Sequence, residues 1–189
     1  MTKRGLVPAG DICEGDLLVT RDHGYQPVNW VGRRALSREE IVRRTHLAPI
    51  LIKRGALGAG IPEQDMMVSP QHKMLWMSAS SSVFFGDPEI FVAAKHLTYL
   101  PGIETILADK VVYLHFLFDQ HEVVLADGAW SESFNPGQNV LTGMDKEQSS
   151  ELLTLFPDLR DDQKSSAFLS ARRSLKRHET VLLAQKVSF

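Results

Sequence analysis

Residues 66–76 read Met-Met-Val-Ser-Pro-Gln-His-Lys-Met-Leu-Trp, and this stretch decides the fold. Apolar residues run into a polar break from Ser69 to His72 and resume after it, which is typical of two strands joined by a tight corner. Pro70 fixes its own φ and favours an extended backbone at Ser69, so we expect a stiff corner. The corner would hold a hydroxyl and an imidazole between apolar flanks, which predicts a site partly shielded from water. The alternative is an ordinary turn in which both side chains satisfy local backbone groups.

The composition is that of a globular protein, with 43% hydrophobic and 23% charged residues in 189. A formal net charge of −2 argues against nucleic acid or an anionic membrane as a partner. No apolar run is long enough to span a bilayer or to serve as a signal peptide. A chain with one thiol fits a reducing, cytoplasmic location, and the alternative is export as part of a parent protein. The single cysteine, Cys13, excludes an internal disulfide and disfavours a cysteine-based metal site, and we expect neither a metal nor a cofactor.

The first part of the chain predicts short elements around the corner. Residues 16–20 and 25–31 flank a glycine turn and predict a hairpin, with Pro27 placing its second strand at a sheet edge. Ser37 is a predicted N-cap for a short helix ending near residue 44. Strands are further predicted at 47–53 and 90–94, and loops at 54–62 and 78–82, with a strand end and turn over 83–88.

The second part begins with the longest predicted strand, residues 110–118. Both of its faces are largely apolar, so we expect it to be central in its sheet. With residues 121–126 and 129–134 it predicts a three-strand meander, whose last turn is Asp127-Gly128. Residues 147–156 and 166–185 show helical spacing instead. The sequence therefore predicts an all-β domain over 1–137 and a helical C-terminal extension over 138–189. Basic residues within 172–177 are either a binding patch or a solvated helix face.

Several of these stretches, taken together, resemble the Hedgehog/intein (Hint) superfamily, and a bacterial group of Hint-domain proteins in particular. They are residues 15–24, the Ser69-x-x-His72 corner, residues 113–121 and residues 125–133. Their order and spacing extend the resemblance over nearly the whole chain. The resemblance implies an all-β, horseshoe-like fold of two pseudo-symmetric halves. It also implies autoprocessing, in which a Cys, Ser or Thr attacks the preceding peptide carbonyl and a second nucleophile resolves the resulting thioester or ester.

The resemblance also implies roles for individual residues. His72 would be the proton shuttle, since an imidazole titrates near neutrality. Ser69 would polarise or position the scissile amide, and His121 matches the later histidine of the superfamily. The partner would be the chain's own N-terminal flanking polypeptide, and the helical tail is a candidate surface for another protein.

The sequence departs from the superfamily pattern in three places. Met1 falls within the expected first strand, so the strand that carries the nucleophile is missing from the sequence, and we expect the chain to be truncated or inactive as it stands. Residues 130–133 occupy the place of the His-Asn pair, so we expect no full protein splicing. Residues 29–32 lack the acid of Hedgehog-type domains, for which Asp22 or Asp119 could substitute.

Other interpretations remain open at this point. The chain could be a catalytically dead β-domain that acts as a binding or assembly module. A hydrolase with Ser69 or Ser131 as nucleophile is disfavoured, because neither serine has the glycine-flanked elbow of that class. His115 is expected to be a core histidine, and a metal site from His115 and His121 is disfavoured.

Overall fold

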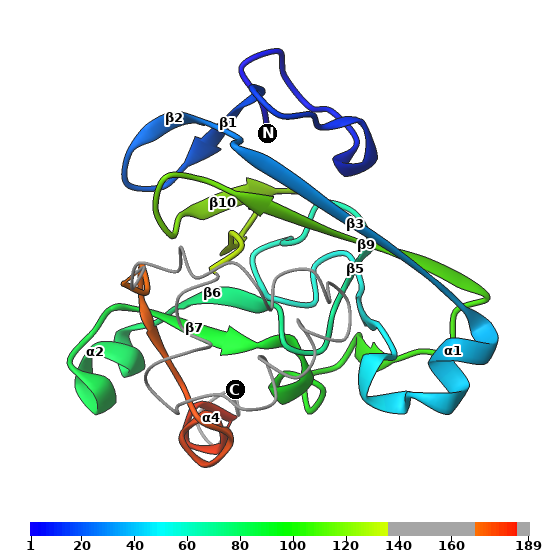
Figure 1. Ribbon diagram of the computed structural model, residues 1–189. Helices are drawn as coiled ribbons and strands as arrows, with labels where there is room; N and C mark the ends of the chain where they lie inside the picture. Colours follow the sequence, from blue (N-terminus) through cyan, green and yellow to red (C-terminus); the bar gives the residue numbers. More distant parts are fainter. Residues whose placement is uncertain (136–168, 185–189) are drawn as a thin grey trace.

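The computed structural model describes residues 1–135 and 169–184, and it confirms the predicted all-β fold with a short C-terminal helix (Figure 1). The strands before the corner are β1 (Leu17–Thr20), β2 (Gly24–Pro27), β3 (Trp30–Ser37), β4 (Ile50–Ile52) and β5 (Met66–Val68). Those after it are β6 (Lys73–Met77), β7 (Glu89–Ala93), β8 (Ile103–Thr105), β9 (Lys110–Leu117), β10 (Val123–Ala126), β11 (Ala129–Glu132) and β12 (Arg173–Ser174). The helices are α1 (Arg38–Arg43), α2 (Ala79–Phe85) and α4 (Arg177–Ala184), with 3-10 turns η1 (Ala9–Asp11), η2 (Thr45–Leu47) and η3 (Ala94–His96).

Within the described residues, seven strands form the main sheet, in the order β12-β7-β6-β11-β10-β1-β2. β4 lies between β5 and β8 in a three-stranded sheet, and β3 pairs with β9 along its whole length. The largest core cluster joins the small sheet to the β6–β7 part of the main sheet. Its buried members include Ile50, Ile52, Met74, Ile90 and Val92. The corner between β5 and β6 thus connects the two sheets.

The predicted hairpins are confirmed. β1 and β2 pair antiparallel, and β2 lies at the edge of the main sheet, where its Pro27 has no strand to bond on its outer side. β10 and β11 are joined by Asp127 and Gly128, which both adopt positive φ as a tight hairpin turn requires. The helix after Ser37 is confirmed as well, because Ser37 and Glu40 form a reciprocal capping box.

The predictions for residues 110–118 are wrong in two respects. β9 pairs with β3 and not with β10, and it is not central, because β3 and β9 form a two-stranded sheet among the described residues. The apolar character of both faces has another cause. Val111 and Tyr113 pack into a small core with Leu36, and residues of both faces, from Val112 to Phe116, border a cavity. An apolar cavity wall and a buried sheet face have the same sequence pattern.

The prediction of a loop and strand end over 78–88 is also wrong. Ser78 caps helix α2 by accepting a hydrogen bond from Ser81 N–H, and Gly86 ends the helix with a φ of 78°. The serine-rich stretch that suggests a loop begins a helix, because the Ser78 side chain satisfies one of its first N–H groups.

Of the two predicted helical stretches in the tail, residues 147–156 lie outside the described residues. The second is shorter than predicted: α4 covers Arg177–Ala184, and β12 precedes it as an edge strand parallel to β7. Leu175 and Leu183 are buried in the main core, so this segment packs on the body (Figure 1). Over 1–135 and 169–184, no helix is both long and apolar enough to cross a membrane.

Candidate functional site

The corner between β5 and β6 is rigid, as the sequence predicts. His72 N–H donates to Ser69 O at 3.1 Å, closing the turn, and Lys95 N–H donates to Pro70 O at 3.0 Å. Ala94 N–H donates to His72 O at 2.9 Å, which ties the far side of the corner to η3. The backbone of Ser69 and His72 is therefore fixed by hydrogen bonds from two directions.

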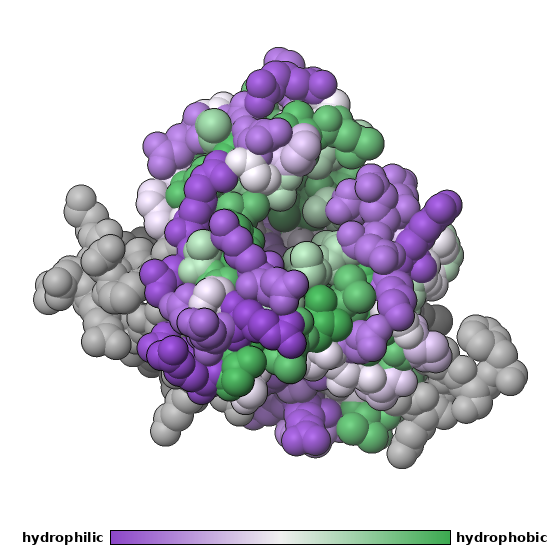
Figure 2. Space-filling view, turned by 90° about the vertical axis from the view of Figure 1, so that its right-hand side faces the viewer, coloured by the Kyte–Doolittle hydropathy of each residue, from purple (hydrophilic) through white to green (hydrophobic). Residues whose placement is uncertain are grey.

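The side chains of Ser69 and His72 both line a cavity of about 380 Å³. Its other walls are β9, the β10–β11 hairpin, the residues that follow β11, and Ala9 of η1. Seen from the side, the surface is hollowed below the N-terminal segment, with apolar patches around the hollow (Figure 2). Among the described residues, neither the Ser69 hydroxyl nor the His72 ring has a hydrogen-bond partner, so both polar groups are available to a bound group.

The histidines of the cavity are held in the neutral form. Burial, with a smaller contribution from the Lys73 ammonium, lowers the pKa of His72 to about 4. His115 also lines the cavity, and burial together with the charge of His72 lowers its pKa to about 3. The sequence interpretation of His115 as a core residue missed this position, because a cavity wall and a core give the same apolar neighbours.

A buried ion pair lies beside the corner. Lys73 Nζ is 3.2 Å from Glu132 Oε2, and the backbone N–H of Lys73 donates to Glu132 Oε1 at 3.1 Å. The two side chains are only 3% and 6% exposed. Glu132 lines the cavity, and sequence reasoning missed it. A signal exists, since residues 73 and 132 are opposite charges within two predicted strands, where a buried charge needs a partner.

His121 lies behind this ion pair and is not part of the cavity lining. Its fully buried ring places Nε2 at 3.6 Å from Glu132 Oε2, and it packs on Phe91 with ring centroids 5.5 Å apart. Burial first, and then Lys73, lower the pKa of His121 to about 3. His72 is among the weaker causes of that shift. His121, which the resemblance assigns to the site, therefore lies behind the cavity lining and not in it.

The two aspartates considered as substitute acids lie elsewhere. Asp22 forms an ion pair with Arg172, and Asp119 accepts a hydrogen bond from the Asn29 side chain at 2.7 Å. Neither lines the cavity. The described carboxylates that do are Asp65, Asp127 and Glu132.

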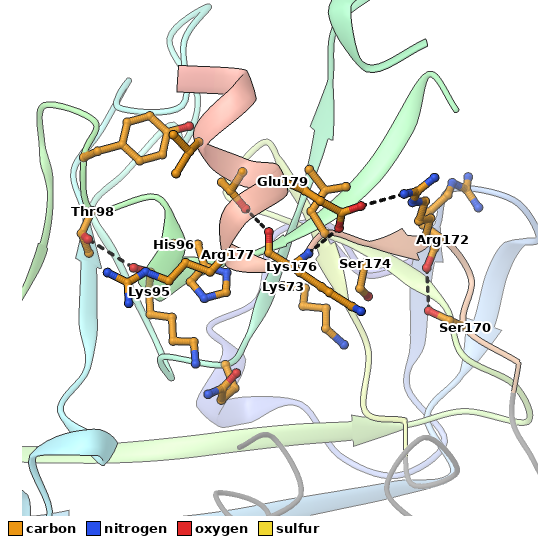
Figure 3. A pocket seen from close by; sticks show the side chains of 16 residues that line it. Lys73, Lys95, His96, Thr98, Ser170, Arg172, Ser174, Lys176, Arg177 and Glu179 are labelled. Carbon is orange, nitrogen blue, oxygen red and sulfur yellow. Dashed lines mark hydrogen bonds and ion pairs between the residues drawn. The ribbon is translucent and has the colours of Figure 1, made fainter. Parts of the chain in front are cut away.

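A larger cavity of about 1000 Å³ lies between α4, β12 and η3, and it contains the basic residues of 172–177 (Figure 3). Many of its charges are neutralised within the chain. Arg172 forms ion pairs with Asp22 and Glu89. Arg173 pairs with Glu179, and Lys73 pairs with Glu132. The basic run is therefore neither a free patch nor simply a solvated helix face, because part of it forms ion pairs that hold the tail on the body.

Taken together, the chain is an all-β domain with a histidine-lined, polar-centred cavity beside its N-terminus. The profile of the Hint domain family matches residues 1–138, and the chain belongs to this family. Comparisons with curated proteins and with solved structures give no match.

Proposed function

We propose that this Hint domain promotes an N-terminal acyl shift in the cavity beside the corner, of the kind that leads to Hedgehog-type self-cleavage. The position of Met1 carries the proposal. Its ammonium group donates to Leu125 O at 2.7 Å. Burial lowers the pKa of this ammonium group, and the nearby Asp127 carboxylate partly opposes that effect by raising it. Asp127 lines the same cavity as Ser69 and His72. A peptide joined to Met1 would therefore leave the domain at the rim of this cavity.

In the proposed reaction, a thiol or hydroxyl of the joined segment attacks the peptide carbonyl next to it. A C–S or C–O bond forms, the C–N bond breaks, and the proton of the nucleophile ends on the leaving amide nitrogen. The pKa of His72, about 4, lies below the near-neutral value expected from the sequence, so near pH 7 the ring is neutral and a weak base. In this proposal it carries the proton only transiently, from the nucleophile to the leaving nitrogen. The Ser69 hydroxyl would donate a hydrogen bond to the carbonyl oxygen as negative charge develops there.

The described residues place no thiol in the cavity, because Cys13 is exposed and not part of its lining. The reaction therefore needs a nucleophile from an attached segment. The proposal stops short of splicing, because residues 130–133 offer Ser131, Glu132 and Ser133 and no side-chain amide for cyclisation. A second nucleophile, either water or a thiol, would resolve the thioester or ester.

The test is a fusion protein in which a tag and a cysteine-bearing strand precede Met1. We expect cleavage on gels that a thiol reagent accelerates. His72→Ala should slow cleavage by about 100-fold or more, in line with the loss of a general acid–base. His46→Ala is the matched control, because His46 is exposed on η2 outside the cavity.

Two results would overturn the proposal. The first is a folded fusion protein that never cleaves with or without thiol. The second is cleavage at the same rate in the His72→Ala and His46→Ala variants. Ser69→Ala separates the two roles, since loss of a positioning hydroxyl should slow the reaction less than loss of the proton carrier.

A second candidate function is a protein-binding or assembly module, favoured by the outer face of α4. Val181 and Leu182 are 50% and 43% exposed, and Val181 lines the same cavity as the partly exposed Tyr99. Light scattering of the full chain tests this candidate. An oligomer that Val181→Asp dissociates would support it, and a monomer at high concentration would count against it.

A further inference from the structure

Residues 170–174 lie beyond the part of the chain that matches the Hint domain family, yet they reach the polar cluster beside the cavity. β12 pairs in parallel with β7, with Arg173 opposite Ile90 and Ser174 opposite Phe91. Leu175 N–H donates to Phe91 O at 2.8 Å. Because Phe91 also packs on the His121 ring, this register brings the segment to His121.

Ion pairs fix the segment in this register. Arg172 donates through Nε to Glu89 Oε2 at 2.8 Å, and through its two terminal nitrogens to the Asp22 carboxylate at 2.7 and 3.0 Å. Ser170 Oγ donates to Arg172 O at 2.7 Å, which shapes the turn before the strand (Figure 3). The backbone on both sides of Ala171 is thus anchored.

The consequence of this anchoring is one hydrogen bond. Ala171 N–H donates to Nδ1 of His121 at 3.1 Å. A neutral imidazole has one donor and one acceptor nitrogen, so an acceptor at Nδ1 puts the proton on Nε2. Nε2 faces Glu132 Oε2 at 3.6 Å. The donor side of the ring, and not its lone pair, then points at the carboxylate.

We propose that residues 170–174 are a positioning segment for His121, in which the Ala171 N–H selects the Nε2–H tautomer and so helps Glu132 to remain ionised against the cavity. The opposite tautomer would turn a lone pair toward the carboxylate and favour its protonation. Lys73 stabilises the same carboxylate from its other side at 3.2 Å. The importance of this tautomer for cleavage rests on the proposed function, whereas the tautomer itself does not.

The direct test is the ¹⁵N chemical shifts of the His121 ring in the full chain, compared between wild type and Ala171→Pro. Proline removes the backbone donor at this position and also restrains φ there, so Arg172→Gln below serves as a variant that leaves the backbone unchanged. We expect wild type to show a protonated Nε2 and an acceptor Nδ1, and Ala171→Pro to show a mixture of tautomers. Leu169→Pro is the matched control, since Leu169 is 88% exposed, and it should leave the shifts unchanged.

Arg172→Gln is a second variant that keeps the Ala171 N–H and loosens its anchor. Arg172→Gln should shift the tautomer ratio in the same direction as Ala171→Pro but by a smaller amount. Arg172→Lys should shift the ratio less than Arg172→Gln does. A protonated Nδ1 in wild type would overturn the proposal. So would an unchanged Nε2–H tautomer in a folded Ala171→Pro chain, or, where that variant does not fold, an unchanged tautomer ratio in Arg172→Gln.

In the cleaving fusion protein, Ala171→Pro should slow cleavage about tenfold, which is less than the effect of losing His72. Because protonation of Glu132 becomes easier, the pH below which the cleavage rate falls should also rise. A changed tautomer with an unchanged rate and pH profile would overturn the catalytic part of the proposal. If the parent fusion protein does not cleave at all, the proposed function fails and the ring shifts still decide whether the segment positions His121.

Discussion

The cavity and the junction between the body and residues 169–184 differ in the charge state of their titratable side chains. The cavity and the cluster behind it hold neutral imidazoles, and burial lowers the pKa of His72 to about 4 and of His115 and His121 to about 3. The junction instead contains ionised carboxylates paired with arginines. Hydrogen bonds from Arg172 and Arg21 lower the pKa values of Asp22 and Glu89, respectively, and both carboxylates remain partly exposed.

His23 makes the same contrast within one residue type. It is half exposed, and its hydrogen bond to the buried Glu122 carboxylate at 3.0 Å raises its pKa. Histidines of this chain are therefore tuned by desolvation in one region and by a carboxylate partner in the other. Neutral rings suit proton transfer, whereas permanent ion pairs suit holding the tail in register. The fold keeps the two tasks apart.

The largest expected effect comes from breaking the ion pair that lies between the two regions. Lys73→Met leaves Glu132 as a buried carboxylate without its ammonium partner, and should cost about 3–5 kcal/mol of unfolding free energy in urea titrations. The double variant Lys73→Met/Glu132→Leu should recover most of that loss. If both variants are equally unstable, packing at these positions matters more than charge.

The next effect is a pH dependence that originates in the cavity. Each buried ring has a pKa near 3 or 4 in the fold against 6.5 as its ordinary value, so the unfolded chain binds more protons between these limits. Stability is therefore complete above pH 6.5 and falls as the pH drops toward 4. His72→Gln should remove on the order of 1–2 kcal/mol of the loss seen at about pH 5. His46→Gln, at an exposed position, should leave the dependence of the unfolding free energy on pH unchanged. The same pH dependence in wild type, His72→Gln and His46→Gln would show that His72 is not its source.

How far the sequence could predict this site depends on the range of the contacts. The corner from Ser69 to His72 is set by Pro70 and by neighbouring residues, so local pattern was enough. The β10–β11 turn at Asp127 and Gly128 is local for the same reason.

Long-range contacts were beyond the same reasoning. The charges of Lys73 and Glu132 in predicted strands indicated that each needs a partner, but not that the two residues, 59 positions apart, pair with each other. Nothing in the sequence indicated that Ala171 reaches His121. The error at β9 has a related cause, since strand pairing with β3 is decided by contacts about 80 residues apart along the chain, which periodicity does not encode. Sequence reasoning thus found the rigid corner and missed the buried charges around it.

At the junction, Arg172→Gln should cost about 1–2 kcal/mol, less than the change at Lys73. Glu89 retains Arg21 as a partner, and Asp22 is accessible enough to be solvated after the change. Urea titration at neutral pH measures the loss, and raising the salt concentration should narrow the difference from wild type. A cost above that of Lys73→Met would reverse the contrast between the two regions.

The smallest effect is expected at an ion pair that belongs to neither region. Arg4 donates through one terminal nitrogen to both oxygens of Asp16 at 2.8 and 2.9 Å, whereas Arg172 reaches the two oxygens of Asp22 with two different nitrogens. The Arg4 side chain is 64% exposed, so water and salt replace most of the attraction, and Arg4→Gln should cost at most about 1 kcal/mol. Asp16 also keeps the Cys13 N–H as a donor at 3.0 Å. Measured beside Arg172→Gln, this variant compares an exposed ion pair made through one nitrogen with a less exposed, bidentate one. Equal costs would mean that the junction gains nothing from its geometry or from its position against the sheet.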